Sequence, residues 1–336
     1  DMSFMGKFLV QGRDAGEFLN YLSANEVNAE DGRITYTQWL NEDGRLEADL
    51  TVTRLDEENF MVVTSDVAHR HTETWMKRHI AEGQNVFVTD VTSGYGQLNV
   101  QGPKSRELLQ SITSADLSNE AFPFRAAREI DIGLARVLCV RITYAGELGY
   151  ELNIPSEQAL HVYDRVVEAG RNFGLVHAGL KALGSLRLEK AYRDYGHDID
   201  NTDDPYSTGL GMFVKPGKEG DFIGKQACLA RKADPVFRKR LVQILLRDPE
   251  PQMFHAEIVL RNGVPVGDVR AASYGFTLGG SVGLAMVEGD PVDAAWLEDG
   301  EWAVDIAGTI YPAEVSLKPM YDPCLLYTSP SPRDAT

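Results

Sequence analysis

Residues 36–55 read YTQWLNEDGRLEADLTVTRL, and residues 46–53 within this stretch alternate apolar with polar side chains. This period of two predicts a β-strand that has one face in the core and one polar face. Asp49 lies on the polar face, a short way along the chain from the aromatic residues Tyr36 and Trp39. An aromatic pair beside a carboxylate suits a pocket for a flat ring. The pattern alone also describes a solvent-exposed strand face, with the aromatic pair at the edge of the core.

The composition is that of a folded globular protein. The chain has 336 residues, of which 43% are hydrophobic and 25% charged, so two or three domains are expected and disorder as the main state is excluded. Only three cysteines are present, and none forms a Cys-x-x-Cys pair. Neither a disulfide scaffold nor a structural zinc site is therefore expected. No apolar run approaches the roughly 18 residues that span a bilayer.

The net charge of −17 limits the partners that the chain can bind. Nucleic acids and anionic membranes attract basic surfaces, so neither is an expected partner. The seven histidines form no cluster with the spacing of metal ligands, and no metal is expected. Free thiols without a visible signal peptide favour the cytoplasm, or the mitochondrial matrix if the source is a eukaryote.

Helix and strand patterns alternate through the first two thirds of the chain. Residues 59–64 predict a strand, and Ser65 or Asp66 is expected to cap a helix that runs to about residue 80. Residues 155–174 predict a further helix. The apolar stripe expected for this helix consists of Leu160, Tyr163 and Val167.

Beyond about residue 209 the pattern changes to short strands divided by glycine-containing turns. Asn262-Gly263 predicts a type I′ hairpin turn, because both residue types tolerate a positive φ. The region therefore predicts a small β-barrel or β-sandwich, with a boundary near Asp234-Pro235. No GxGxxG pattern follows a strand, so a dinucleotide-binding unit is not expected within this chain.

A second candidate site residue lies in residues 143–155, TYAGELGYELNIP. Glu151 alternates with the apolar side chains of Tyr150 and Leu152, and the strand follows a glycine-containing turn. The Glu151 carboxylate suits the amino-pyrimidinone edge of a ring, because it can accept two parallel hydrogen bonds. The same pattern also describes an exposed glutamate on a hairpin.

Six segments carry a family resemblance: residues 1–8, 36–55, 99–109, 143–155, 183–200 and 209–226. In this order and spacing they resemble the glycine-cleavage T-protein (aminomethyltransferase) family. The phrases SNEAFPF, HVYDRVVEAG and DFIGKQA are most similar to the folate-binding C-terminal half of FAD-dependent sarcosine and dimethylglycine dehydrogenases. The resemblance extends over residues 1–322.

The resemblance implies an α+β fold with three units in a clover-leaf around a central folate site. Ferredoxin-like α/β units are expected at residues 1–95, where the N-terminus looks truncated, and at residues 96–233. A C-terminal β-barrel is expected at residues 234–322, and residues 323–336 are interpreted as a disordered, non-native tail. In this branch of the family a FAD-binding domain precedes the folate-binding half. The chain is therefore interpreted as a fragment whose partner is that flavin domain.

The resemblance also assigns site residues. Asp49 matches the key acid of the family, and Glu151 matches its pteridine-binding glutamate. Tyr36 and Met5 match residues that lie near the folate. Ser65 stands where the family has an asparagine after a strand, and we expect it to contact the folate as well.

The chain departs from the family pattern at three further positions. Ala48 replaces the first acid of an Asp-Asp pair, Leu183 replaces an arginine, and Ser207 replaces a glutamate in a Pro-x-Glu-x-Gly motif. The leucine argues against the lipoyl-carrier substrate of the T-protein. The serine puts the usual contacts of its loop in doubt.

The function implied by the resemblance is tetrahydrofolate-dependent one-carbon transfer from a methylated amine. A flavin domain would oxidise an N-methyl amine of the sarcosine or dimethylglycine type to an iminium, and 5,10-methylene-tetrahydrofolate would be formed. Asp49 would stabilise the developing cation electrostatically. The alternatives are a freestanding aminomethyltransferase of glycine cleavage, a folate-dependent demethylase and a non-catalytic folate-binding module.

Overall fold

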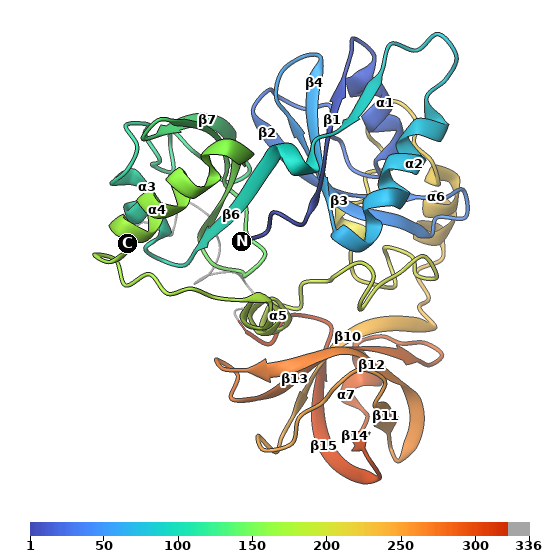
Figure 1. Cartoon of the computed structure of the whole chain (residues 1–336). Coiled ribbons are helices and arrows are strands. Elements are labelled where there is room, and N and C mark those ends of the chain that lie inside the picture. Colours follow the sequence, from blue (N-terminus) through green and yellow to red (C-terminus); the bar gives the residue numbers. More distant parts are fainter. Residues whose placement is uncertain (322–336) are drawn as a thin grey trace.

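Two antiparallel sheets and a closed β-barrel organise the chain (Figure 1). The computed structural model describes residues 1–321, so the tail expected at residues 323–336 lies outside the described residues. The α+β class and the C-terminal barrel are confirmed. The domain boundaries after residues 95 and 233 stay predictions.

The first sheet has five strands in the order β2-β3-β4-β1-β5. Their bounds are β1 (Gly6–Gln11), β2 (Arg33–Leu40), β3 (Leu46–Arg54), β4 (Asn59–Thr64) and β5 (Phe87–Asp90). Two helices, α1 (Ala15–Leu22) and α2 (His69–His79), pack on one face, where Phe18 and Trp75 join the strand residues Phe8 and Leu50 in one core. The strand predicted at residues 59–64 is confirmed. The helix predicted after it begins as the short 3₁₀ turn η1 (Asp66–Ala68) and continues as α2.

The second sheet has four strands in the order β6-β9-β8-β7. Their bounds are β6 (Tyr95–Gln101), β7 (Ala127–Ile132), β8 (Ala135–Val140) and β9 (Gly149–Pro155). The short 3₁₀ turns η2 (Thr92–Gly94) and η3 (Ser156–Gln158) stand before β6 and after β9. Helices α3 (Ser105–Gln110) and α4 (Ala159–Gly170) cover one face, where Leu108 and Val162 pack on Leu152. As in the first sheet, the helices leave the other face uncovered.

The apolar stripe expected for α4 was wrong. Leu160 is 70% exposed and Tyr163 is 38% exposed, whereas Val162 and Val166 are buried. Val162, Val166 and Gly170 recur every four residues and form the face of the helix that packs against β6 and β9. Packing against the sheet, not the size of the apolar side chains, therefore selected the buried stripe.

The C-terminal barrel closes in the order β10-β13-β12-β11-β14-β15. The bounds are β10 (Lys239–Leu246), β11 (Ile258–Arg261), β12 (Val264–Gly275), β13 (Gly280–Glu288), β14 (Trp302–Ile306) and β15 (Thr309–Ser316), with the short helix α7 (Ala294–Glu298) between β13 and β14. Asn262 and Gly263 join β11 to β12 with φ values of 51° and 76°. These positive values fit the type I′ turn predicted from the sequence.

The segment between the second sheet and the barrel returns to the first unit. It contains α5 (Leu180–Glu189), the 3₁₀ turn η4 (Gly211–Phe213) and α6 (Lys225–Ala233). The Ile223 N–H donates to the carbonyl of Tyr21 over 3.1 Å, and Leu46 N–H donates to the carbonyl of Asp203 over 3.0 Å. An apolar cluster with members from all these parts joins the first unit, this segment and the barrel. Among residues 1–321, no helix has the length and apolar character needed to cross a membrane.

Candidate functional site

The two uncovered sheet faces pack against each other. Ile34 on β2 contacts Ala127 and Val140 of the second sheet in a small apolar cluster. The Ile34 N–H also donates to the carbonyl of Arg125 over 3.0 Å. Residues that are partners across antiparallel strands share a face. The strand register therefore identifies the polar side chains that lie in this interface.

β2 and β3 place Tyr36, Gln38 and Asp49 together on the uncovered face of the first sheet. Gln38 is the direct partner of Asp49, and Tyr36 is the partner of Thr51. The Tyr36 hydroxyl donates to Oδ2 of Asp49 over 2.8 Å, and Nε2 of Gln38 donates to Oδ1 over 2.9 Å. Both carboxylate oxygens are held by donors, which fixes the orientation of the carboxylate.

Asp49 titrates near neutral pH. Burial raises the pKa of Asp49 to about 7, although the hydrogen bonds from Tyr36 and Gln38 lower it. The negative charges of Asp194 and Asp198 raise this pKa further. The carboxyl group is therefore poised between its two protonation states, and a cation placed beside it would favour the ionised form.

The buried Arg187 and the partly buried Arg193 bring positive charge to the same region. Nε of Arg193 donates to the carbonyl of Thr208 over 2.8 Å. Burial lowers the pKa of Arg193, and the negative charge of Asp49 is among the interactions that raise it. Arg187 on α5 forms an ion pair with Asp198, with 3.1 Å between Nη1 and Oδ1. The charges around Asp49 thus belong to a mixed network.

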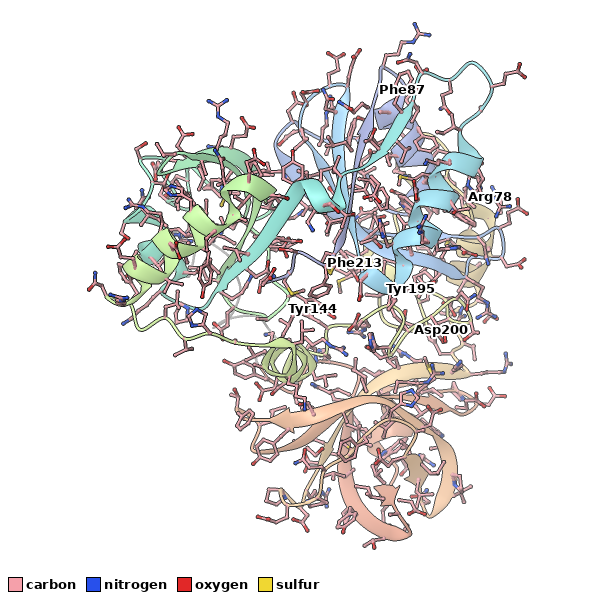
Figure 2. All side chains as sticks on the ribbon, in the orientation of Figure 1. Arg78, Phe87, Tyr144, Tyr195, Asp200 and Phe213 are labelled. Atoms are coloured by element: carbon pink, nitrogen blue, oxygen red, sulfur yellow. The ribbon has the colours of Figure 1, made fainter. Side chains whose placement is uncertain are left out.

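Aromatic side chains from different parts of the fold lie near Asp49. The Tyr144 hydroxyl, from the loop after β8, donates to the carbonyl of Arg193 over 2.7 Å. The ring of Phe213 stands edge-on to the ring of Tyr36, with 4.8 Å between centroids. Figure 2 shows Tyr144 and Phe213 in the central region of the molecule, between the two sheets and the barrel. The second unit and the segment after α5 therefore both contribute to the surroundings of Asp49.

Glu151 lies on the uncovered face of the second sheet, where it is the direct partner of Asn99. Nε2 of Gln97 donates to Oε2 of Glu151 over 3.1 Å, and the Asn99 side chain is hydrogen-bonded to Glu151 as well. Burial raises the pKa of Glu151 to about 7, while these two hydrogen bonds and the positive charge of Lys7 lower it. The glutamate predicted from the sequence is thus held in place in the interface between the sheets.

β1 contributes the buried Lys7 to this interface. The register across β4 puts Lys7 on the same face as Asp49. Its Nζ donates to the carbonyls of Ser3 and Met5 over 3.0 and 2.8 Å. Burial lowers the pKa of Lys7 to about 8, and the negative charge of Glu151 raises it. Lys7 therefore links the face that carries Asp49 electrostatically to the sheet that carries Glu151.

Met5 and Ser65 lie next to each other in register, because Gly6 at the start of β1 pairs with Thr64 at the end of β4. Both residues are partly buried. Ser65 occupies the N-cap position of η1, but its side chain makes no capping hydrogen bond. Its Oγ is buried and has no hydrogen-bond partner within residues 1–321. A contact of either residue with folate stays a prediction, as do the roles of Asp49, Glu151 and Tyr36.

The three departures from the family pattern have different surroundings. Ala48 is 1% exposed and faces the core, so the position of the first acid serves packing here. Leu183 is partly exposed on α5. Ser207 is 8% exposed, and both its N–H and its hydroxyl are hydrogen-bonded to Asp204 within the same loop.

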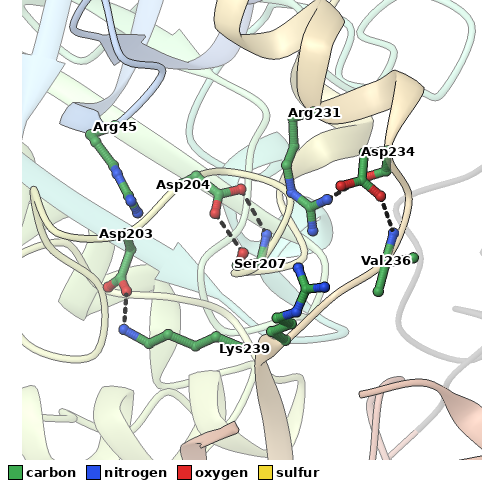
Figure 3. A pocket seen from close by; sticks show the side chains of 9 residues that line it. Arg45, Asp203, Asp204, Ser207, Arg231, Asp234, Val236 and Lys239 are labelled. Atoms are coloured by element: carbon green, nitrogen blue, oxygen red, sulfur yellow. Dashed lines mark hydrogen bonds and ion pairs between the residues drawn. The ribbon is translucent and has the colours of Figure 1, made fainter. Parts of the chain in front are cut away.

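Ser207 and Asp204 help to line a polar pocket of about 290 Å³ between α6 and the start of β10 (Figure 3). Basic and acidic side chains alternate around it, and Nζ of Lys239 lies 3.3 Å from Oδ1 of Asp203. The lining, as far as residues 1–321 form it, includes none of the five predicted site residues. Within the same residues, no group of three or more His, Cys, Asp or Glu side chains is placed to hold a metal ion.

Sequence reasoning missed Gln38, Lys7, Gln97 and Asn99. A signal for the last two was present, because YGQLNVQ at residues 95–101 alternates polar with apolar side chains. A lone cation in the strand GKFLVQ could have pointed to Lys7. Gln38 had no signal of its own, since only the pairing of β2 with β3 places it beside Asp49.

Comparisons with known proteins identify the family. The model of the GCVT N-terminal domain matches residues 1–218, and that of the glycine cleavage T-protein C-terminal barrel domain matches residues 239–322. A 4-methylaminobutanoate oxidase (formaldehyde-forming) of Paenarthrobacter nicotinovorans is 41% identical over 324 residues, which are 96% of this chain and 38% of that protein. The mitochondrial sarcosine dehydrogenase of Mus musculus is 34% identical over 340 residues, covering 96% of this chain and 37% of that protein.

A solved structure agrees with these relatives. The glycine cleavage system aminomethyltransferase T from Bartonella henselae matches with a TM-score of 0.83 and 25% identity, over 96% of this chain and 86% of that chain. The present chain spans somewhat over a third of the length of each of the two curated relatives named above. The expected family and fold are confirmed by these matches. The chain belongs to the glycine cleavage T-protein family.

Proposed function

We propose that this chain is the tetrahydrofolate-dependent one-carbon transfer part of an enzyme that oxidises an N-methyl amine. The observation that carries the proposal is that Asp49 and Glu151 lie on the two sheet faces that pack against each other. The two amine-oxidising relatives support the class of substrate, which would be an amine of the sarcosine or dimethylglycine type. The oxidation itself belongs in this proposal to a FAD-binding domain of a longer protein.

The residues of the interface fit the heterocycle of tetrahydrofolate. Glu151 offers two carboxylate oxygens to the N–H groups of an amino-pyrimidinone edge. Its orientation is preset by Gln97 and Asn99, so little ordering is needed when the ring binds. Lys7 supplies a positive charge that favours the ionised carboxylate. When bound, tetrahydrofolate would supply the nucleophilic nitrogens that take up the one-carbon unit.

Asp49 acts electrostatically in this proposal. Tyr36 and Gln38 hold its carboxylate in one orientation before the substrate arrives, which is the condition for efficient stabilisation of a developing charge. An iminium beside Asp49 lowers the pKa of the carboxyl group and keeps it ionised. In the overall exchange the CH₂ group passes to the folate, and two N–H hydrogens of the folate end on the departing amine, which leaves as an ammonium ion. Asp49 is the group we assign to relay a proton between them.

The test is product formation by the protein encoded together with its upstream sequence. An N-methyl amine and tetrahydrofolate should give 5,10-methylene-tetrahydrofolate, and Asp49→Asn should reduce that product at least a hundredfold while oxidation of the amine continues. Asp43→Asn, at an exposed position of the turn before β3, is the matched control. Unchanged product formation by Asp49→Asn would refute the role of this carboxylate.

A freestanding aminomethyltransferase is the second candidate. The solved aminomethyltransferase matches over 86% of its own chain, so the present chain comes close to the length of such an enzyme. Leu183, where the family has an arginine, disfavours the lipoyl-carrier substrate. Transfer of an aminomethyl group from a lipoyl carrier by this chain alone would favour the second candidate over the first.

A further inference from the structure

A row of polar side chains lines the interface on the second sheet. Gln97, Asn99 and Gln101 alternate along β6, and their apolar neighbours on the strand face the helices. Asn153 is the direct partner of Gln97 on β9, on the same face as Glu151. Gln97 and Asn153 are each 2% exposed. Asn99 and Gln101 are partly buried, so the row is shielded from bulk solvent to different extents along its length.

Several atoms of this row lack hydrogen-bond partners. Oε1 of Gln97, Oδ1 of Asn99 and Oδ1 of Asn153 are buried, and none of them finds a partner within the described part of the chain, residues 1–321. Buried acceptors without partners are costly, and native proteins usually retain them for a ligand or for water. Three such oxygens on one face form a surface that accepts hydrogen bonds.

Glu151 determines which way two of these amides point. A carboxylate can only accept hydrogen bonds, so Gln97 and Asn99 must turn their NH₂ groups toward it. Their carbonyl oxygens are then directed away from Glu151 and stay available. The acceptor character of Gln97 and Asn99 therefore follows from their contacts with Glu151. Within residues 1–321 no hydrogen bond orients the Asn153 amide, so it can turn its oxygen to the same side.

Gln101 presents a hydrogen-bond donor, where the other three residues present acceptors. The Thr143 hydroxyl accepts a hydrogen bond from the Gly146 N–H and donates its own proton to Oε1 of Gln101 over 3.1 Å. This leaves Nε2 of Gln101 as a buried donor without a partner in residues 1–321. Along β6, at about 3.3 Å per residue, Gln97 and Gln101 lie on either side of Asn99 and of its partner Glu151.

We propose that this row selects the reduced oxidation states of the folate ring. The inference rests on the proposed function, with the amino-pyrimidinone edge bound at Glu151. Glu151 could hold this edge in two orientations of the ring, and we choose the one in which the ring carbonyl accepts from Nε2 of Gln101. Ring atoms N1 and N8 then lie on the side of Gln97 and Asn153. N1 carries the same lone pair at every oxidation state of the ring, so N8 is the atom that distinguishes these states. In dihydrofolate and tetrahydrofolate N8 carries a hydrogen that these oxygens can accept. In folic acid N8 carries no hydrogen, so its lone pair would face the acceptor oxygens of Gln97 and Asn153 without a hydrogen bond.

Calorimetric titration of this chain under anaerobic conditions tests the inference with three ligands: tetrahydrofolate, 7,8-dihydrofolate and folic acid. Both reduced folates should bind at least tenfold more tightly than folic acid. Asn153→Leu, which keeps the approximate size of the side chain, should weaken both reduced folates about tenfold and change the affinity for folic acid less than twofold. Asn172→Leu, at an exposed position after α4, should leave all three affinities unchanged.

A second variant tests the donor side of the row. Gln101→Met removes the side-chain N–H group that would donate to the ring carbonyl. Because all three ligands have this carbonyl, all three affinities should fall by a similar factor. Equal affinity of the unmodified chain for all three folates would overturn the inference without touching the proposed function. This comparison uses the unmodified chain alone, so its outcome does not depend on whether a variant folds. Equal losses for all three ligands in Asn153→Leu would overturn it as well. Failure of every folate to bind would remove the proposed function and this inference together.

Discussion

The hydroxyl of Tyr36 donates a 2.8 Å hydrogen bond to Oδ2 of Asp49, from one strand of the first sheet to its neighbour. This bond opposes the effect of burial, which raises the pKa of Asp49 to about 7. The same tyrosine packs edge-on against Phe213, in the segment that follows α5. The position of one aromatic side chain thus ties the titration of Asp49 to the packing between two parts of the fold.

Removing the Tyr36 hydroxyl should shift the pH dependence of transfer. In Tyr36→Phe the ionised form of Asp49 loses a donor, so its pKa should rise further above 7. Because the proposed function needs ionised Asp49, the rise of the transfer rate with pH should move upward by about one pH unit. Rates measured from pH 6 to 9 check this. Tyr21→Phe, at a position that is 44% exposed, is the control, and an unshifted profile in Tyr36→Phe would show that the hydroxyl does not tune Asp49.

Asp49→Asn should stabilise the protein at alkaline pH. The folded-state pKa of about 7 lies above the unfolded value near 4, so the stability linked to this group is fully present below pH 4. It is lost progressively as the pH rises to about 7, and the loss amounts to roughly 2 to 4 kcal/mol. Asparagine carries no charge, and Gln38 can turn its amide to accept from it. Urea unfolding at pH 5 and pH 8 should show a clearly larger gain at pH 8 than at pH 5, with Asp43→Asn unchanged at both. A destabilised Asp49→Asn at pH 8 would contradict the expectation.

Folate affinity should rise as the pH increases through about 7. Glu151 has a pKa of about 7 because burial raises it, and its ionised form is the one that accepts two hydrogen bonds from the ring. Glu151→Gln should weaken tetrahydrofolate binding at pH 8 by about 2–3 kcal/mol and remove most of the pH dependence. Titrations at pH 6 and pH 8 decide this, with Glu157→Gln, an exposed position in η3, as the control. Unaltered binding by Glu151→Gln would place the ring elsewhere.

Lys7→Met should move the same transition to higher pH. The positive charge of Lys7 lowers the pKa of Glu151, so its removal lets burial raise that pKa further. The carbonyls of Ser3 and Met5 also lose their donor, and the free energy of unfolding should fall by about 1–3 kcal/mol. Titration with tetrahydrofolate at several pH values, beside urea unfolding, separates the two effects. An unchanged transition together with reduced stability would mean that Lys7 only anchors residues 1–5.

Several features depended on local sequence alone. Asp49 and Glu151 were expected on polar strand faces, and the register places them there, because successive side chains of a strand point to opposite sides whatever packs on them. The turn at Asn262 and Gly263 is likewise local, since it needs only residues that tolerate positive φ.

Other features were decided by packing between distant parts of the chain. Alternation cannot tell whether a polar strand face meets water or another sheet. The contact of Ile34 with Val140 brings the two uncovered faces together, and this burial raises the pKa values of Asp49 and Glu151 to about 7. Packing between distant segments also decided which face of α4 is buried and which groups contact Lys7. Burial and charge depend on which surfaces meet, and a short stretch of sequence contains only one of the two surfaces.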